Sequence, residues 1–254
     1  MAHVARTVSR RAASLIAGLA LLLAAGVAEA QEKPVYLRLI GIQSATVAPH
    51  GMGFAALSLT NQRAPGDDSN DGSAVVGFGL GNAEDRVGWQ FTAHITSLTN
   101  EFGDSGYLSV KASKRLVAGE SPVYGSLMFG QLANWGDANP RGETVAAAVT
   151  RFSWLNRGDP DRAMPMMMTF GVGNDLRNNN RDAGVFAGIG VGLTENLAAS
   201  LAWTGESVTV GTGFRIGGLD NIGFALSVDD AFNQVDNRRL ILSIGVTFDS
   251  LFGG

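Results

Sequence analysis

The segment RLILSIGVTF, residues 239–248, alternates strictly between large apolar residues and residues that are mostly polar or small. One side of the extended chain holds Leu240, Leu242, Ile244, Val246 and Phe248. Such alternation is typical of a β-strand with one apolar face. That face has two possible environments, the core of a soluble protein or the hydrocarbon of a membrane.

The same unit, alternation followed by a polar turn, repeats from Gly51 onward. In VGWQFTAHI (87–95), for example, the large apolar residues oppose Gly, Gln, Thr and His. No segment shows a convincing 3.6-residue period, so we predict an all-β chain. With ends set to within about two to four residues, the predicted strands lie at 51–60, 73–80, 85–98, 105–116, 122–134, 143–154, 164–173, 183–192, 196–204, 207–216, 221–228 and 238–248.

The opposite face of these strands distinguishes the two environments. It consists mostly of Gly, Ser, Thr and Ala, and only 17% of the chain is charged. A soluble sandwich usually fills its water-facing side with long charged residues, whereas small polar residues suit the interior of a closed barrel in lipid. Closure also pairs backbone groups that an open sheet edge would leave unsatisfied in hydrocarbon. We therefore predict a single antiparallel up-and-down transmembrane β-barrel of about twelve strands, within a range of about 10–14.

The connections between the predicted strands vary in length as such a barrel requires. Long polar connections follow the first, third, fifth, seventh and eleventh strands, and short turns follow the second, fourth, eighth and tenth. Outer-membrane barrels alternate short periplasmic turns with longer outer loops, and both termini lie in the periplasm. Two connections depart from this order: 155–163 is long where a turn is expected, and 205–206 is short where a loop is expected.

The first thirty residues are interpreted as a secretory signal peptide. A positively charged N-terminal region with three Arg residues is followed by an apolar run at 15–27 and an A-x-A cleavage site at 28–30. The apolar run is too short for a transmembrane helix, which needs about 20 residues. We predict cleavage between Ala30 and Gln31, then a periplasmic lead-in at 31–50, the barrel at 51–249 and a C-terminal tail at 250–254.

The composition excludes several classes of function. The chain has 19 basic and 23 acidic side chains, and cleavage after Ala30 removes three Arg and one Glu, which leaves a net charge of −6. A nucleic-acid-binding protein would carry a basic footprint instead. The chain has no cysteine and therefore offers neither disulfides nor thiolate ligands. After residue 30 no apolar run approaches the length of a transmembrane helix.

With this pattern, residues 51–248 resemble a bacterial outer-membrane β-barrel, porin-like in the loose sense. The stretch GFGLGN (77–82) is similar to stretches in glycine-rich barrels of Gram-negative bacteria and cyanobacteria that generally lack an assigned activity. The resemblance implies an outer-membrane location, contact with lipid and insertion by the barrel assembly machinery, and it implies no chemistry. Such barrels commonly end on an aromatic residue, whereas here Phe252 is followed by two glycines.

Few residues could carry chemistry. His94 and Thr96 share the polar face of one strand, which resembles the His-x-Ser pair of outer-membrane phospholipases, but Thr96 stands where the nucleophilic Ser belongs. The stretch DDSNDG (67–72) begins like a calcium loop, yet its twelfth position, which should be a bidentate Glu, is Phe78. We therefore predict no enzyme activity, no metal and no cofactor. A phospholipase-like enzyme is kept as a remote alternative.

Six polar or basic residues lie on the face predicted to line the bore: Gln90, His94, Lys111, Arg115, Arg215 and Arg239. No acidic residue joins them in the middle of a strand, so an open bore would be positive and would weakly favour anions. The sequence supports an alternative equally well. In that alternative the cations pair with acidic loop residues or fill a closed barrel of structural use.

We therefore predict a narrow, weakly anion-selective pore for small solutes, which the lead-in at 31–49 is long enough to occlude from the periplasmic side. The competing interpretation is a soluble or surface-attached exported β-sandwich or barrel, periplasmic or secreted, that acts as a binding or structural module. The sequence leaves the solute and the oligomeric state open.

Overall fold

The computed structural model describes residues 36–62, 69–98, 102–138, 142–159, 162–178, 181–249 and 251–252. The predicted signal peptide at 1–30 and its cleavage site after Ala30 lie outside these residues, as does the start of the acidic stretch 67–72. The signal peptide and the division at Gln31 therefore stay predictions.

Twelve strands make up the described structure, and all twelve match predicted segments. They are β1 (Gly53–Thr60), β2 (Asp71–Gly81), β3 (Gly88–Ile95), β4 (Gly106–Val117), β5 (Val123–Trp135), β6 (Thr144–Leu155), β7 (Met164–Arg177), β8 (Asp182–Thr194), β9 (Leu197–Trp203), β10 (Val208–Arg215), β11 (Ile222–Asp229) and β12 (Arg239–Phe248), with a short 3-10 helix η1 (Gly136–Ala138) after β5. The clearest difference is β7, which continues past its predicted end near 173. It does so because it pairs with β8 again beyond a register shift, at Arg177 and Asp182.

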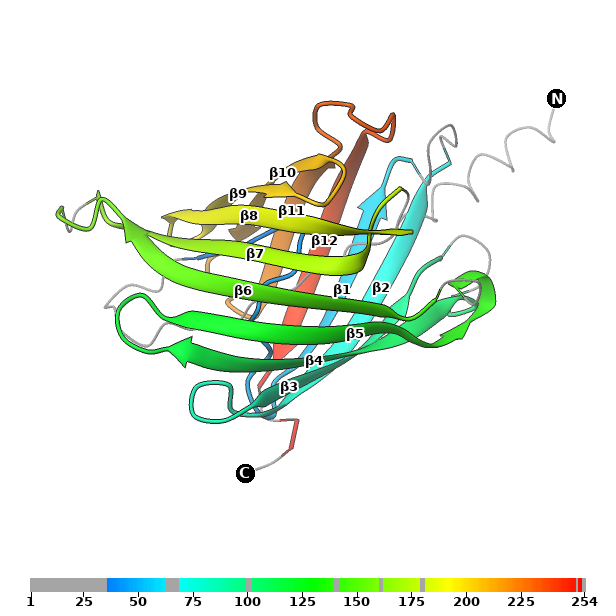
Figure 1. Ribbon diagram of the computed structural model, residues 1–254. Helices are drawn as coiled ribbons and strands as arrows, with labels where there is room; N and C mark the ends of the chain where they lie inside the picture. The colour runs from blue at the N-terminus through cyan, green and yellow to red at the C-terminus, as the bar shows by residue number, and fades with distance from the viewer. Residues whose placement is uncertain are drawn as a thin grey trace.

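The sheet closes into a barrel because the first and last strands pair. Each strand is hydrogen-bonded to its neighbours in sequence, and β1 pairs antiparallel with β12 from Gly53↔Phe248 to Thr60↔Ile241. The predicted single antiparallel up-and-down barrel is therefore confirmed, and the sandwich arrangement is wrong. We call the end where β1 begins and β12 finishes the turn end, and the opposite end the loop end (Figure 1).

The outer face of the barrel carries a band of exposed apolar side chains that runs all the way round. Every strand contributes at least one large hydrophobic side chain that is more than a third exposed. One from each strand, in order, is Leu57, Val76, Trp89, Leu108, Leu127, Val145, Phe170, Val185, Leu201, Val210, Leu226 and Leu242. Soluble monomers rarely expose a contiguous apolar surface larger than a few hundred Å². In β12 the exposed residues include Leu240, Leu242 and Ile244. The apolar side of 239–248 thus faces out of the barrel and not into a protein core.

The inner face of the barrel is lined by small polar side chains. Buried hydroxyl residues occur along most of the wall: Ser58, Ser73, Thr92, Ser109, Ser113, Ser126, Thr150, Thr169, Ser200, Thr209, Ser227 and Ser243. The strand faces thus have the orientation that the alternation predicts. No helix in the described part of the chain has the length and apolar character needed to cross a membrane.

Candidate functional site

The chain before β1 passes through the inside of the barrel. We call residues 36–50 the lumen segment. Its contacts define its path: Tyr36 lies at the turn end of β10 and β11, Gly41 is near the loop end of β10, and Ala45 lies against β4 and β6. His50 then bridges to β2 beside the start of β1. The lumen segment therefore enters and leaves by the turn end and arches across the bore, as the blue trace in Figure 1 shows.

Apolar packing holds the lumen segment in place. Leu39 and Ile42 belong to one buried cluster with Tyr124, Met167 and Phe186 from the barrel wall. Burial of an aliphatic side chain contributes roughly 1.5–3 kcal/mol. The segment is therefore an integral part of the folded interior.

Hydrogen bonds from the wall satisfy the backbone of the lumen segment. The Ala45 amide donates to Thr150 Oγ1 at 2.7 Å, and the Ala48 amide donates to Gln90 Oε1 at 3.0 Å. Two carbonyl oxygens accept bonds from β4: that of Ser44 from Lys111 Nζ at 3.3 Å, and that of Ala45 from Ser113 Oγ. Because the segment is in no sheet, these side chains take the place of a strand partner.

Inward-facing glycines make room for the lumen segment. A Cβ at Gly79 would collide with the carbonyl oxygen of Ala48, and a Cβ at Gly190 would collide with that of Arg38. From the sequence, small inward residues indicate an open bore. The structure shows that much of the space they leave is filled by the protein's own backbone.

The six predicted bore residues belong to two groups. Gln90, His94 and Lys111 line one cavity in the bore. The other three contact acidic or aromatic side chains: Arg115 pairs with Glu84, Arg239 Nη2 lies 2.6 Å from Asp229 Oδ2, and the guanidinium of Arg215 lies 4.6 Å from the centre of the Tyr36 ring. The ion pairs of Arg115 and Arg239 correspond to the alternative in which the bore cations are neutralised. The part that these six residues play in a pore stays a prediction.

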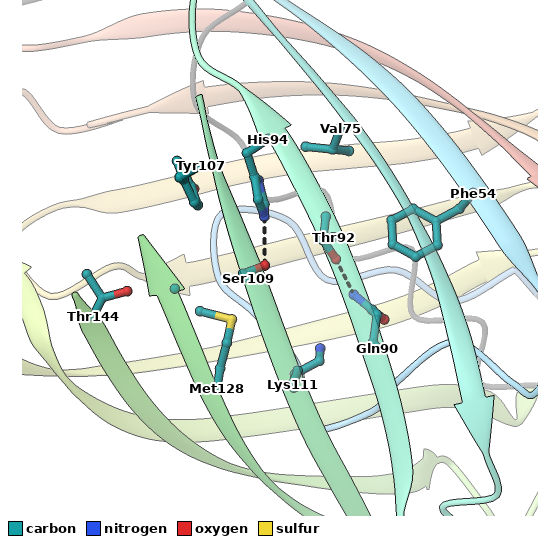
Figure 2. A pocket seen from close by; sticks show the side chains of 11 residues that line it. Phe54, Val75, Gln90, Thr92, His94, Tyr107, Ser109, Lys111, Met128 and Thr144 are labelled. Atoms are coloured by element: carbon teal, nitrogen blue, oxygen red, sulfur yellow. Dashed lines mark hydrogen bonds between the residues drawn. The ribbon is translucent and has the colours of Figure 1, made fainter. Parts of the chain in front are cut away.

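The cavity, here called the lumen cavity, has a volume of about 70 Å³ and is bounded by side chains of β1 to β6. Figure 2 shows His94, Ser109 and Lys111 on neighbouring strands β3 and β4, with Phe54 and Val75 on the far side. Lys111 is only 2% exposed. The cavity thus combines apolar walls with one buried cation.

The structure brings Ser109, rather than Thr96, to His94. His94 Nε2 lies 2.9 Å from Ser109 Oγ, and the imidazole stacks on Tyr107 with ring centres 4.4 Å apart. Thr96 instead shares a hydrogen bond with Ser105. Sequence reasoning missed Ser109 because His94 and Ser109 lie on different strands. Their contact depends on the β3–β4 register, which sets His94 opposite Tyr107 and Thr92 opposite Ser109.

A second buried cation, Arg38, was also absent from the predicted set. Its Nη1 donates to Tyr36 Oη at 2.6 Å and to the Phe224 carbonyl at 3.0 Å, and the side chain is only 3% exposed. Arginine stays protonated in proteins, so Arg38 adds a positive charge to the bore. The sequence analysis allows the lead-in at 31–49 to occlude the bore, but this stretch has no strand alternation that would assign the side chain of Arg38 to a face.

Metal-binding side chains do not gather at this site. Among the residues that the structure describes, no three His, Cys, Asp or Glu side chains come together in a way that could hold a metal ion. The predicted absence of a metal or cofactor stays a prediction.

Comparison with known proteins adds a likeness of fold. No family model matches the chain, and no curated protein does. Among solved structures, the chain is similar to the KdgM porin, described in complex with disordered oligogalacturonate, with a TM-score of 0.50 and 9% identity over 78% of this chain and 99% of that one. The outer membrane protein Omp33 of Acinetobacter baumannii gives a TM-score of 0.47 and 12% identity over 78% and 98% of the two chains. An outer membrane channel of Pseudomonas putida F1 gives 0.46 and 12% over 82% and 99%.

Proposed function

We propose that this protein is an outer-membrane β-barrel and a narrow channel for small solutes, with the lumen segment occupying much of its bore. The observation that carries the proposal is the division of the two faces: large apolar side chains are exposed on all twelve strands, while small hydroxyl residues are buried inside. Such a surface suits lipid, and such an interior suits an aqueous passage. The likeness to a porin fold agrees with it.

A weak preference for anions follows from the cations in the bore. Within the described chain, Lys111 and Arg38 are buried and have no carboxylate within salt-bridge distance. Arg115 and Arg239 are paired with acids and contribute little net charge. Arg215 lies against the Tyr36 ring and likewise has no carboxylate in salt-bridge contact among the described residues. Uncompensated positive charges in a confined, low-dielectric wall attract anions and repel cations.

Planar-bilayer recording of the refolded mature protein tests the channel. We expect small conductance steps, larger steps after deletion of residues 31–49, and a reversal potential that favours chloride over potassium. Lys111→Glu should reduce or reverse that preference, because it replaces a buried positive charge with a negative one. Silent bilayers for both the full protein and the deletion variant would contradict the channel and leave a structural barrel.

The partners that this proposal names are outer-membrane lipid, the barrel assembly machinery and small solutes. We propose no enzymatic function. His94 and Ser109 form a base–hydroxyl contact, but among the described residues no carboxylate orients the other ring nitrogen. A catalytic triad needs that third group to fix the tautomer of the imidazole. A serine-reactive fluorophosphonate probe should leave Ser109 unlabelled, and labelling that disappears in His94→Ala would show a hydrolase instead.

A further inference from the structure

Lys111 presents unused hydrogen-bond donors inside the barrel. An ammonium group has three N–H donors, and the structure gives Lys111 Nζ one acceptor, the Ser44 carbonyl at 3.3 Å. The side chain is 2% exposed and lines the lumen cavity. A buried charge is stable only when it is paired or well hydrogen-bonded. Lys111 therefore lacks a partner of opposite charge at the wall of a cavity.

Hydroxyl groups beside Lys111 provide further donors. Thr92 Oγ1 accepts a hydrogen bond from Gln90 Nε2 at 3.3 Å, which leaves its own proton free to donate. Ser109 lies on β4 two residues from Lys111, and its one proton is free to donate when His94 Nε2 carries the hydrogen of the bond that the two side chains share. All of these side chains line the lumen cavity (Figure 2). The polar part of the cavity therefore suits a ligand that accepts hydrogen bonds and carries negative charge.

The remaining lining strengthens attraction to such a ligand. Phe54, Val75 and Met128 form the apolar part of the wall. In surroundings of low dielectric constant, the attraction between opposite charges is several times larger than in water. An anion beside Lys111 would thus regain in Coulomb energy much of what it loses in hydration.

We propose that the lumen cavity binds one small monovalent anion, a halide, a nitrate or a one-carbon carboxylate, against Lys111, with Thr92 and Ser109 as hydrogen-bond donors. The volume of about 70 Å³ sets the size of the anion. One water molecule needs roughly 10–15 Å³ by the same kind of measure, so the cavity accommodates an ion of a few non-hydrogen atoms and not a sugar acid. This inference rests on the proposed function, because it places an anion-binding site on the route through the channel.

Titration of the refolded mature barrel in detergent with ¹³C-labelled formate, in chloride-free buffer, tests the site. We expect saturable broadening of the formate NMR signal, reversed by chloride and not by gluconate, which is too large. Lys111→Met should weaken formate binding about tenfold or more, since it removes a charge-assisted hydrogen bond. Lys114→Met is the matched control, because Lys114 lies on the same strand but is exposed, and it should bind formate as the wild type does.

A second variant keeps the test decisive if Lys111→Met does not fold. The double variant Thr92→Val, Ser109→Ala keeps the cation and removes two donors, and it should weaken formate binding several-fold. Wild-type protein without saturable broadening, or equal binding by wild type and Lys111→Met, would overturn the anion site. Bilayer recording separates the two proposals: formate binding with silent bilayers would remove the channel alone, and conductance without formate binding would remove the site alone.

Discussion

Asp230 organises the connection between β11 and β12. Its carboxylate accepts hydrogen bonds from the backbone amides of Gln234 at 2.5 Å, Val235 at 3.1 Å and Asn237 at 3.0 Å. Burial on its own raises the pKa of Asp230, but the three amide donors outweigh it and hold the pKa below its usual range. The charged form of one side chain thus replaces the strand partners that this loop lacks.

Asp230→Ala should loosen this loop without opening the barrel. Loss of the acceptor removes the partner of three amides, at a cost of about 1–3 kcal/mol for each amide that water does not reach. Trypsin should then cut faster after the exposed Arg238, as measured by mass spectrometry of the folded protein, while Asp236→Ala should change little. Asp236 accepts a side-chain bond from Asn233 but is exposed. Unchanged cleavage in Asp230→Ala would show that the loop is held by other contacts.

The same carboxylate makes the loop sensitive to acid. A lowered folded pKa means that the stabilisation is fully present above the unfolded pKa of about 3.9 and is lost as the pH falls through the folded value. Amide exchange at Val235 and Asn237 should therefore differ between wild type and Asp230→Ala at neutral pH, and the difference should disappear in strong acid.

The lumen segment and the strand faces that receive it fit together as one unit. The close approach of Gly190 on β8 to the Arg38 carbonyl leaves no space for a side chain. Arg38 itself is only 3% exposed. The fit therefore protects a potential trypsin site inside the barrel.

Gly190→Ala should displace the lumen segment. The new Cβ meets backbone rather than a flexible side chain, and overpacking of this kind costs typically about 1–3 kcal/mol. We expect trypsin to cut after Arg38 in the variant and not in the wild type, together with a larger single-channel conductance. Gly217→Ala is the control, because a Cβ at Gly217 has nothing within 4 Å. A protected Arg38 in Gly190→Ala would mean that the segment adjusts within the bore.

The exposed apolar band surrounds the whole barrel, and a substitution within it tests whether the band faces lipid or water. Leu242 is 45% exposed and lies in the middle of β12, between Leu59 of β1 and Leu226 of β11. In lipid, an arginine at the centre of a barrel strand costs about 2–4 kcal/mol. In water, an exposed leucine-to-arginine change would be nearly neutral.

Leu242→Arg should therefore destabilise the refolded protein in bilayers, as measured by denaturant unfolding, whereas Leu219→Arg should not. Leu219 is similarly exposed, at 42%, but lies in the turn between β10 and β11. The wild type should also be recovered in the outer-membrane fraction and migrate faster on gels before heating than after. A mature protein that stays in the soluble periplasmic extract would contradict the membrane location.

Local sequence patterns were sufficient for the strands and their faces. Alternation specifies extended chain and assigns each side chain to one of two sides, as in β12, where Leu242 faces out and Ser243 faces in. Turn lengths then specify antiparallel neighbours. These are short-range properties, and the twelve strands follow from them.

Only the tertiary structure decided what occupies the bore. Glycine at 79 and 190 is compatible with an open channel or with a close-packed backbone. A glycine in the sequence shows that the position has no side chain, but it does not show whether water or another part of the chain fills the space. The lumen segment has no strand pattern, and its partners lie on β3, β4, β6 and β10, far from it in sequence. The pairing of Arg239 with Asp229 and the isolation of Lys111 likewise depend on register and closure, which bring distant positions together.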